Sequence, residues 1–279
     1  VTELPKATRG FGVAVGDLNK DGWIDLAFGD LMGKQLVVAY NSPEGFLEKG
    51  IQKFEGFAPV FLKLADVDND GWLDIAAPSI RDNVVRIYRN SPDGFSDADR
   101  QDLFTMGPTN MKFADLNSDG YLDMVVPGFW DGNSLDPHAL SSIYWGGPEG
   151  YTNYNRTLLK TVGASGVAIS DLNGDGHLDI VISSYHDGSK RDAKSQIFWG
   201  DGKGFSEDNA QSLQTYSGSG VLTLDLNQDG LIDLVFANHN KNNSHRTESF
   251  IYWNTKEGFS EANRTELPAI GPQEFSDAD

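Results

Sequence analysis

Short runs in which apolar residues alternate with polar ones, or follow one another directly, recur along the chain, and none extends into a long pattern of helical period. Alternation with a period of two is typical of a β-strand, whereas a helix repeats its apolar positions every three to four residues. The runs come in groups of four. The first runs are residues 13–15, 62–64, 111–113, 167–169 and 221–223, and the second are 26–28, 75–77, 124–126, 180–182 and 234–236. The third runs are residues 37–40, 85–88, 143–145, 197–199 and 251–253, and the more polar fourth runs include 156–159 and 264–267.

An acidic segment of nine residues lies between the first and second run of every group. Its pattern is Asp, apolar, Asn or Asp, any, Asp, Gly, any, Leu or Ile, Asp, and its five copies begin 49, 49, 56 and 54 residues apart at Asp17, Asp66, Asp115, Asp171 and Asp225. Four short strands in about 50 residues predict a β-propeller blade, here a four-stranded antiparallel one. We therefore expect one all-β domain over residues 1–279. A stacked β-solenoid is the alternative, but its calcium repeats are much shorter, at about nine residues per turn.

Blades with this acidic loop between their first and second strands resemble the FG-GAP (VCBS) repeats of integrin α-subunit propellers and of many bacterial surface proteins. The segment Arg264–Pro268 and the Ile-Tyr-Trp run at 251–253 are similar to the bacterial branch. The chain has no Cys, whereas integrin propellers carry disulfides, which also favours the bacterial branch. The resemblance implies a Ca²⁺-binding ring of seven blades.

Both ends of the chain match parts of the repeat. Residues 271–279 align with the segment before the third acidic loop, so that Asp277 and Asp279 stand at positions one and three of a sixth loop. The opening segment 2–5 likewise matches 265–268. We expect five full repeats and the start of a sixth, as part of a larger ring or a ring completed by a partner chain.

The acidic loops predict calcium sites, about one per repeat. Ca²⁺ prefers about six to eight oxygen ligands, and alternate residues of a tight loop direct their side chains to one point. Gly at position six permits the sharp turn. Each site would use four side chains and the carbonyl of position seven. The expected ligands are Asp17, Asn19, Asp21, Trp23 and Asp25; Asp66, Asp68, Asp70, Trp72 and Asp74; Asp115, Asn117, Asp119, Tyr121 and Asp123; Asp171, Asn173, Asp175, His177 and Asp179; and Asp225, Asn227, Asp229, Leu231 and Asp233.

Other metals and several partners fit the sequence poorly. Zinc is disfavoured because no Cys or His side chain is among the ligands, and Mg²⁺ because it prefers a strict octahedron and keeps its waters. A formal charge of −19, from 41 acidic and 22 basic residues, argues against nucleic acid and against an anionic membrane surface. No apolar run reaches the ~18 residues of a membrane span.

The metal chemistry also bears on location. Weak extracellular Ca²⁺ sites, with Kd of about 10⁻⁴–10⁻³ M, fill outside the cell and stay mostly empty in the cytosol. We therefore expect an extracellular, cell-surface or periplasmic protein. The opening residues 1–5 carry no basic or apolar leader, so an export signal would have been removed or would lie outside this chain.

The loops between the second and third strands are the candidate ligand site, because they should lie opposite the acidic loops and differ most between repeats. They are short in the first two repeats and longer at 128–140, 184–194 and 238–248. The candidate ligand-binding residues are Phe129, Trp130, His138, Tyr185, His186, His239, His245 and Arg246. Aromatic rings among polar donors suit a glycan or a protein partner, although loops lengthened by drift would look the same.

Three functions remain open at this point. The first is a non-catalytic adhesion or recognition module for a protein or glycan. The second is a scaffold subunit of a larger surface assembly. The third is a carbohydrate-active enzyme such as a polysaccharide lyase, since some are built on similar propellers. None of the common hydrolase, metalloprotease, phosphate-loop or dinucleotide motifs occurs, so binding without catalysis is the prediction.

Overall fold

The computed structural model describes residues 10–130, 138–188, 191–241 and 244–272, and these form five four-stranded antiparallel sheets. Each sheet is one contiguous stretch of chain, with its strands side by side in sequence order. Sheet one is β1 (Gly10–Gly16), β2 (Asp25–Asp30), β3 (Gln35–Ala39) and β4 (Ile51–Glu55); sheet two is β5 (Lys63–Ala65), β6 (Asp74–Ser79), β7 (Val84–Tyr88) and β8 (Arg100–Phe104); sheet three is β9 (Lys112–Ala114), β10 (Asp123–Val126), β11 (Leu140–Tyr144) and β12 (Arg156–Lys160). Sheet four is β13 (Ala164–Ser170), β14 (Asp179–Ser184), β15 (Ser195–Phe198) and β16 (Ala210–Leu213), and sheet five is β17 (Gly218–Leu224), β18 (Asp233–Asn238), β19 (Arg246–Tyr252) and β20 (Arg264–Ile270).

The prediction of an all-β chain of four-stranded antiparallel repeats is confirmed. The helices in the described part of the chain are single turns of 3₁₀ type that precede fourth strands: η1 (Glu48–Gly50), η2 (Asp97–Asp99), η3 (Glu207–Asn209) and η4 (Glu261–Asn263). None of the described helices is long and apolar enough to cross a bilayer. The second strands are the most deeply buried, and every residue of β6, β10, β14 and β18 is buried. Their nearly continuous apolar sequence follows from cover on both faces.

The described residues form four hydrophobic core clusters, and each cluster joins two consecutive sheets. Phe54 of β4 packs on Tyr88 of β7 with ring centroids 4.7 Å apart, inside the cluster between sheets one and two. The clusters between the following sheets contain Leu103 with Tyr144, Leu159 with Phe198, and Leu213 with Phe250. A single sheet would expose this apolar surface to water, so each repeat depends on its neighbour for a core.

The first strands bring neighbouring sheets closest together. Gly12 in β1 has φ +67°, and a Cβ there would lie 2.6 Å from the Cα of Phe61 at the start of sheet two. A Cβ on Gly166 in β13 would lie 2.9 Å from the Cα of Gly220 in β17. Glycine is required at these two positions because any side chain would collide with the neighbouring backbone.

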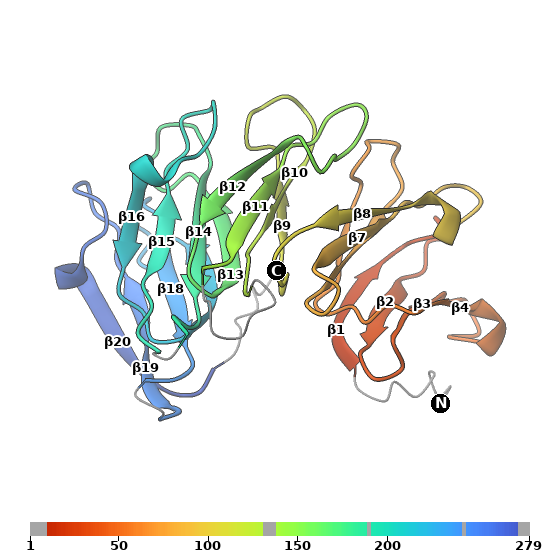
Figure 1. Ribbon diagram of the computed structural model, residues 1–279, viewed down its shortest axis with the longest axis horizontal. Coiled ribbons are helices and arrows are strands. Elements are labelled where there is room, and N and C mark those ends of the chain that lie inside the picture. Colours follow the sequence, from red (N-terminus) through yellow and green to blue (C-terminus); the bar gives the residue numbers. More distant parts are fainter. Residues whose placement is uncertain (1–9, 131–137, 189–190, 242–243, 273–279) are drawn as a thin grey trace.

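The five sheets follow one another in a row from sheet one to sheet five, and these two sheets lie at opposite ends of the row (Figure 1). The acidic loops connect first to second strands, and the candidate ligand loops connect second to third strands. They therefore lie at opposite ends of the second strands, and we call the two sides the acidic face and the opposite face.

Candidate functional site

The acidic loops share one pattern of backbone hydrogen bonds. Asp17, at position one of the first loop, accepts the N–H groups of Asp21 at 3.1 Å and Gly22 at 2.9 Å. The equivalent bonds to Asp66, Asp115, Asp171 and Asp225 span 2.8–3.2 Å. Gly at position six has φ of 86–88° in all five loops. The side chain at position one is thus held in place by the loop's own backbone.

The aspartate at position nine has a second role that the sequence motif did not indicate. Asp74 is fully buried and accepts the N–H of Val67 in its loop at 3.0 Å and the N–H of Asn90 after the third strand at 2.7 Å. Its counterparts make the same pair of bonds and are equally buried: Asp25, Asp123, Asp179 and Asp233. This carboxylate therefore joins the loop, the second strand and the end of the third strand.

Burial makes the charge on position nine costly. Burial is the largest cause that raises the pKa of Asp74 to about 7, against two backbone hydrogen bonds that lower it. The same balance raises the pKa of Asp123 and of Asp179 to about 6, and the pKa of Asp25 is raised as well. A cation beside these carboxylates would favour their ionised form.

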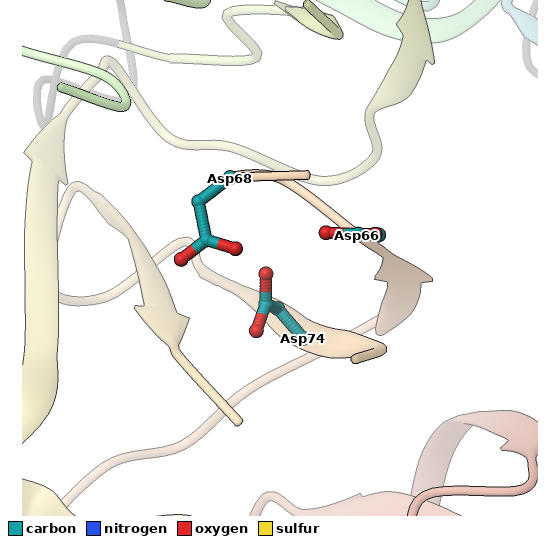
Figure 2. A group of neighbouring side chains, drawn as sticks. All are labelled: Asp66, Asp68 and Asp74. Carbon is teal, nitrogen blue, oxygen red and sulfur yellow. The ribbon is translucent and has the colours of Figure 1, made fainter. Parts of the chain in front are cut away.

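The second loop gathers the most negative charge. Carboxylate oxygens of Asp66, Asp68 and Asp74 lie within 4.8 Å of one another (Figure 2). Burial, followed by the charge of Asp70, raises the pKa of Asp68, although the Arg89 guanidinium lies 3.9 Å away. Three carboxylates at this separation form an all-oxygen donor set that fits a hard cation such as Ca²⁺.

The other four loops have Asn at position three, and this changes their electrostatics. The Asn19 side chain donates from Nδ2 to Asp21 at 2.8 Å and accepts the Asp21 N–H at 3.0 Å. Asn117, Asn173 and Asn227 make the same contacts. The Asn amide partly compensates the carboxylate at position five, which the second loop cannot do because Asp68 has no donor.

The predicted position-seven ligands Trp23, Trp72, Tyr121, His177 and Leu231 each donate their N–H to the aspartate at position five, at 2.8–2.9 Å. Metal coordination by their carbonyls stays a prediction. Asp277 and Asp279 lie outside the described residues.

On the opposite face, five of the eight candidate ligand residues form a continuous row across sheets three, four and five. The Phe129 ring lies 5.9 Å from Tyr185 and 4.9 Å from His186, between ring centroids. Tyr185 lies 5.6 Å from His239, which lies 4.7 Å from His245. We call these five side chains the aromatic row. Phe129, Tyr185 and His239 occupy one position of the repeat, six residues after the position-nine aspartate.

The side chains of the aromatic row are partly exposed to solvent, and one of them contacts a guanidinium group. Its members are partly buried, apart from the exposed His245. The Arg191 guanidinium lies 5.1 Å from the Tyr185 ring centroid, which is a cation–π distance. Burial, followed by the charge of Arg191, lowers the pKa of His186, so this imidazole is mostly neutral at pH 7.

The remaining three candidates lie apart from the row. Trp130 packs over Gly107, where a Cβ would lie 2.9 Å from the indole Cδ1. His138 lines a cleft of about 400 Å³ between sheets three and four, together with Lys160 and Lys194. Arg246 is exposed at the start of β19.

Sequence reasoning missed the glycines that support this face. Gly107, Gly163 and Gly271 have φ of 48–53°, and they lie beneath Trp130, His186 and His239 respectively. A Cβ on Gly163 would lie 2.3 Å from the carbonyl oxygen of His186. Their recurrence shortly after fourth strands, at 107, 163 and 271, was the available signal.

Taken together, the fold and loops define a class of repeat protein built from four-stranded sheets that each carry one acidic loop. The FG-GAP-like repeat family matches residues 37–126 and 171–236, which is more than half of the chain. The chain belongs to this family.

No curated protein matches the chain. Among solved structures, the chain is similar to the Vibrio cholerae biofilm matrix protein Bap1, with 16% sequence identity and a TM-score of 0.48. The match covers 89% of this chain, which spans only 38% of the length of that protein.

Proposed function

We propose that this chain is an extracellular, calcium-stabilised β-propeller domain that binds a protein or glycan ligand through the opposite face, without catalysis. The observation that carries the proposal is the aromatic row, which places Phe129, Tyr185 and His239 from three repeats side by side. Because each comes from the same repeat position, a radial arrangement of sheets would bring them around a common axis.

The contacts between first strands support a propeller. β1 contacts β5, β9 contacts β13, and β13 contacts β17, so the first strands meet at three of the four junctions between consecutive sheets. In a propeller the first strand of each blade lies nearest the axis, with the others spreading outward. Such a ring requires that each sheet is one contiguous stretch of chain and that it shares a hydrophobic cluster with the sheet beside it.

Calcium is the proposed structural ion that stabilises each blade at its acidic loop. A bound Ca²⁺ would add positive charge beside Asp66, Asp68 and Asp74, with their carboxylates and the equivalent oxygens of the other loops as ligands. Each ion would stabilise the native state through binding, by an amount that grows with the ratio of free Ca²⁺ to Kd. The loops sit at the ends of strands, so the ions serve structure rather than chemistry.

The test of the calcium proposal is thermal. We expect removal of Ca²⁺ by EGTA at pH 7.5 to lower Tm by about 5 °C or more, since about 1 kcal/mol shifts Tm by roughly 2–4 °C in a domain of this size. Re-addition of Ca²⁺, but not of Mg²⁺ at the same concentration, should restore it. An unchanged Tm in EGTA contradicts the proposal.

Ligand recognition fits half-exposed rings that already pack against one another. Such rings lose little side-chain entropy when a ligand binds, and they present flat apolar surface beside imidazole and guanidinium donors. A pyranose face or an aromatic side chain of a partner would pack on this surface.

Binding can be tested by screening glycan and protein arrays with the wild-type chain and a Tyr185→Ala variant. Loss of one specific ligand in the variant supports the proposal. Tyr154→Ala is the matched control, because Tyr154 is 97% exposed and lies outside the row. Ligands retained equally by both variants would show that the row is not the site.

A second candidate function is favoured by the cleft between sheets three and four. Lys160 and Lys194 line it beside His138, together with Asp187 and Asp192. The lysines could bind the carboxylates of an acidic polysaccharide, and the imidazole could act as a base in its lyase chemistry. Release of unsaturated products from such polymers by the wild-type chain, and not by His138→Ala, would favour the enzyme over the binding module.

A further inference from the structure

A cleft of about 290 Å³ lies between sheets four and five on the acidic face. It is lined by Leu172 and Asn173 of the fourth acidic loop, by Leu231 of the fifth loop, by Trp199 after β15, and by the turn that follows β19. Small-molecule sites enclose roughly 300–1,000 Å³, so a cleft of this volume fits a ligand of about one ring.

At the first two junctions between consecutive sheets, the residue after the third strand covers the glycine turn of the following sheet. A Cβ on Gly94 in sheet two would lie 3.9 Å from the hydroxyl of Tyr40 in sheet one. A Cβ on Gly150 in sheet three would lie 2.5 Å from the guanidinium of Arg89 in sheet two. The equivalent space is therefore filled at both junctions.

The third and fourth junctions differ, although both have a Trp at this position. Trp145 stacks on Phe205 of the following sheet, with ring centroids 6.4 Å apart and an angle of 19° between the ring planes. Among the described residues, no ring stacks on Trp199 in this way, and no atom beyond its chain neighbours lies within 4 Å of a Cβ on Gly258. The turn of sheet five therefore leaves the space beside Trp199 open.

The acidic loops beside the cleft also carry smaller residues than those at the first junction. There Lys20, at position four of one loop, lies 4.1 Å from the ring centroid of Trp72, at position seven of the next. In the fourth loop position four is Gly174, which has no side chain, and in the fifth loop position seven is Leu231. The cleft therefore follows from residues that are particular to this junction.

The indole of Trp199 offers a hydrogen-bond donor that its equivalents have already used. Trp145 and Trp253 each donate from Nε1 to a threonine of the fourth strand, at 3.0 and 2.8 Å. Beside Trp199 that strand position holds Gln211, whose amide donates to a backbone carbonyl of sheet five. Within the described part of the chain the Trp199 N–H has no partner, so it is available to a polar ligand.

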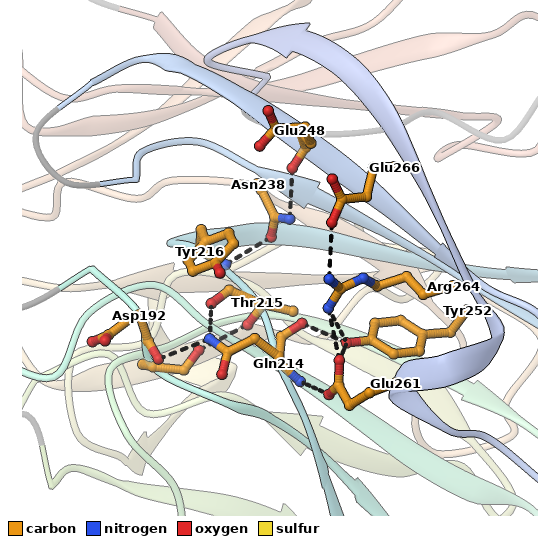
Figure 3. A network of polar contacts seen from close by, with 11 residues as sticks. Asp192, Gln214, Thr215, Tyr216, Asn238, Glu248, Tyr252, Glu261, Arg264 and Glu266 are labelled. Carbon is orange, nitrogen blue, oxygen red and sulfur yellow. Dashed lines mark hydrogen bonds and ion pairs between the residues drawn. The ribbon is translucent and has the colours of Figure 1, made fainter.

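Hydrogen bonds between the two sheets hold the walls of the cleft in place. Asn254 is 4% exposed and donates from Nδ2 to the carbonyls of Leu172 at 2.7 Å and Ile232 at 3.1 Å. At the same junction the Tyr252 hydroxyl donates to the Gln214 carbonyl at 2.7 Å (Figure 3). A preformed cleft loses little conformational entropy when a ligand binds.

We propose that this cleft binds one pyranose ring of a glycan, with the apolar face of the sugar on the indole of Trp199. The site lies on the acidic face, so it is separate from the aromatic row and does not depend on the function proposed for the opposite face. A pyranose combines a flat apolar face with hydroxyl groups at its edge, and these match an indole surrounded by polar groups.

The polar lining supplies both donors and acceptors for such hydroxyls. Lys256 is an exposed ammonium donor, and the Thr255 hydroxyl can accept. Asn173 uses one Nδ2 hydrogen on Asp175, and the other stays available even if the carbonyl oxygen of Asn173 binds Ca²⁺. An aromatic side chain of a protein partner would leave these groups without partners, which favours a sugar.

The experiment titrates the chain in millimolar Ca²⁺ and follows binding by saturation-transfer NMR. The probes are the methyl glycosides of glucose, galactose and mannose, methyl glucuronide, and p-cresol, which stands for an aromatic side chain. We expect at least one glycoside to bind with a Kd of about 1 mM, an affinity usual for a ligand of this size. Lys256→Gln should weaken the glucuronide alone if the ligand is an acidic sugar, and should leave a neutral sugar little changed.

Two variants test the cleft from opposite directions. Trp199→Ala removes the stacking surface, and Leu231→Trp fills the cleft with the side chain that the first two loops carry at that position. Each should raise Kd by about tenfold or more, which corresponds to about 1.4 kcal/mol. Trp253→Ala is the matched control, because the Trp253 indole is already bonded to Thr265 and lines no part of the cleft.

Tyr185→Ala alters the aromatic row and should bind the glycoside like the wild type. Thermal unfolding of all variants establishes that they fold. The inference is overturned if no glycoside binds up to about 10 mM, if p-cresol alone binds, or if wild type, Trp199→Ala and Leu231→Trp bind equally. Binding that is lost only in Tyr185→Ala overturns it as well, and would support the function proposed for the opposite face.

Discussion

At the scale of single residues, the buried aspartate at position nine links the stability of each repeat to pH. Asp74, Asp123 and Asp179 have pKa values of about 7, 6 and 6 in the folded chain, against a reference value of 3.8. The folded state therefore binds these protons more tightly than the unfolded chain does. Its stability is greatest below about pH 4 from these groups and declines as pH rises toward 7.

We expect the calcium-free chain to melt at a higher temperature at pH 5.5 than at pH 7.5, by about 3 °C or more. Scanning calorimetry of chain dialysed free of Ca²⁺ measures this difference. In millimolar Ca²⁺ the difference should shrink or reverse, because the ion binds the ionised carboxylates. A calcium-free chain that is less stable at pH 5.5 contradicts the assigned direction.

A second residue-scale prediction concerns position three. Asp68→Asn gives the second loop the amide that the other loops use to compensate position five, so the calcium-free Tm should rise by about 2 °C or more while the gain in Tm on adding Ca²⁺ falls. Asn117→Asp in the third loop is the reciprocal change and should do the opposite. Thermal scans with and without Ca²⁺ compare the two. Equal calcium responses in both variants and the wild type would argue against a role for this position.

At the scale of elements, the fourth residue of a fourth strand is buried in the internal sheets and exposed in sheet five. Leu103 of β8 is fully buried, whereas Leu267 at the same position of β20 is 41% exposed. Leu103→Ala should therefore reduce the free energy of unfolding by about 2–5 kcal/mol through a cavity, and Leu267→Ala by less than about 1 kcal/mol. Urea denaturation of the dilute, monomeric chain provides both values. Similar losses would mean that β20 is also covered in solution.

The strands could be predicted from the sequence, but which of their residues are buried by a neighbouring sheet could not. The alternation of apolar and polar residues on both sides of each acidic loop predicts the first and second strands. Short apolar runs that flank a tight loop of Asp and Gly are typical of two strands joined by a turn. Leu172 and Leu226 stand in the same motif, yet they are 3% and 39% exposed. Among the described residues a following sheet covers Leu172 and none covers Leu226, and a local pattern carries no information about such cover.

The same limit applies to the candidate sites. The face that holds Phe129, Tyr185 and His239 could be predicted from loop length, but their mutual contacts depend on the angle between sheets. The two bonds of Asp74 span the loop and the end of the third strand, 7 and 16 residues away. Such a contact is set by the register of the sheet rather than by the motif.

At the scale of the whole molecule, each core cluster is shared by only two sheets, so stability should vary along the row. Sheet three packs on a neighbour at each side, whereas sheets one and five have one neighbour each among the described residues. We expect hydrogen exchange in the dilute chain to be slowest in β10 and β14 and faster in β2 and β18. Uniform protection in all second strands would indicate a closed and fully cooperative ring.

Because each sheet in the described part of the chain is one contiguous stretch with no strand exchanged, a pull on the two ends of that part meets five separable units in series. Each unit that gives way would release a repeat of 49–56 residues, or ~170–200 Å at ~3.5 Å per extended residue, while the others remain folded. A domain held between two anchoring points would thus lengthen in stages under load and dissipate work at each stage, instead of failing in a single event.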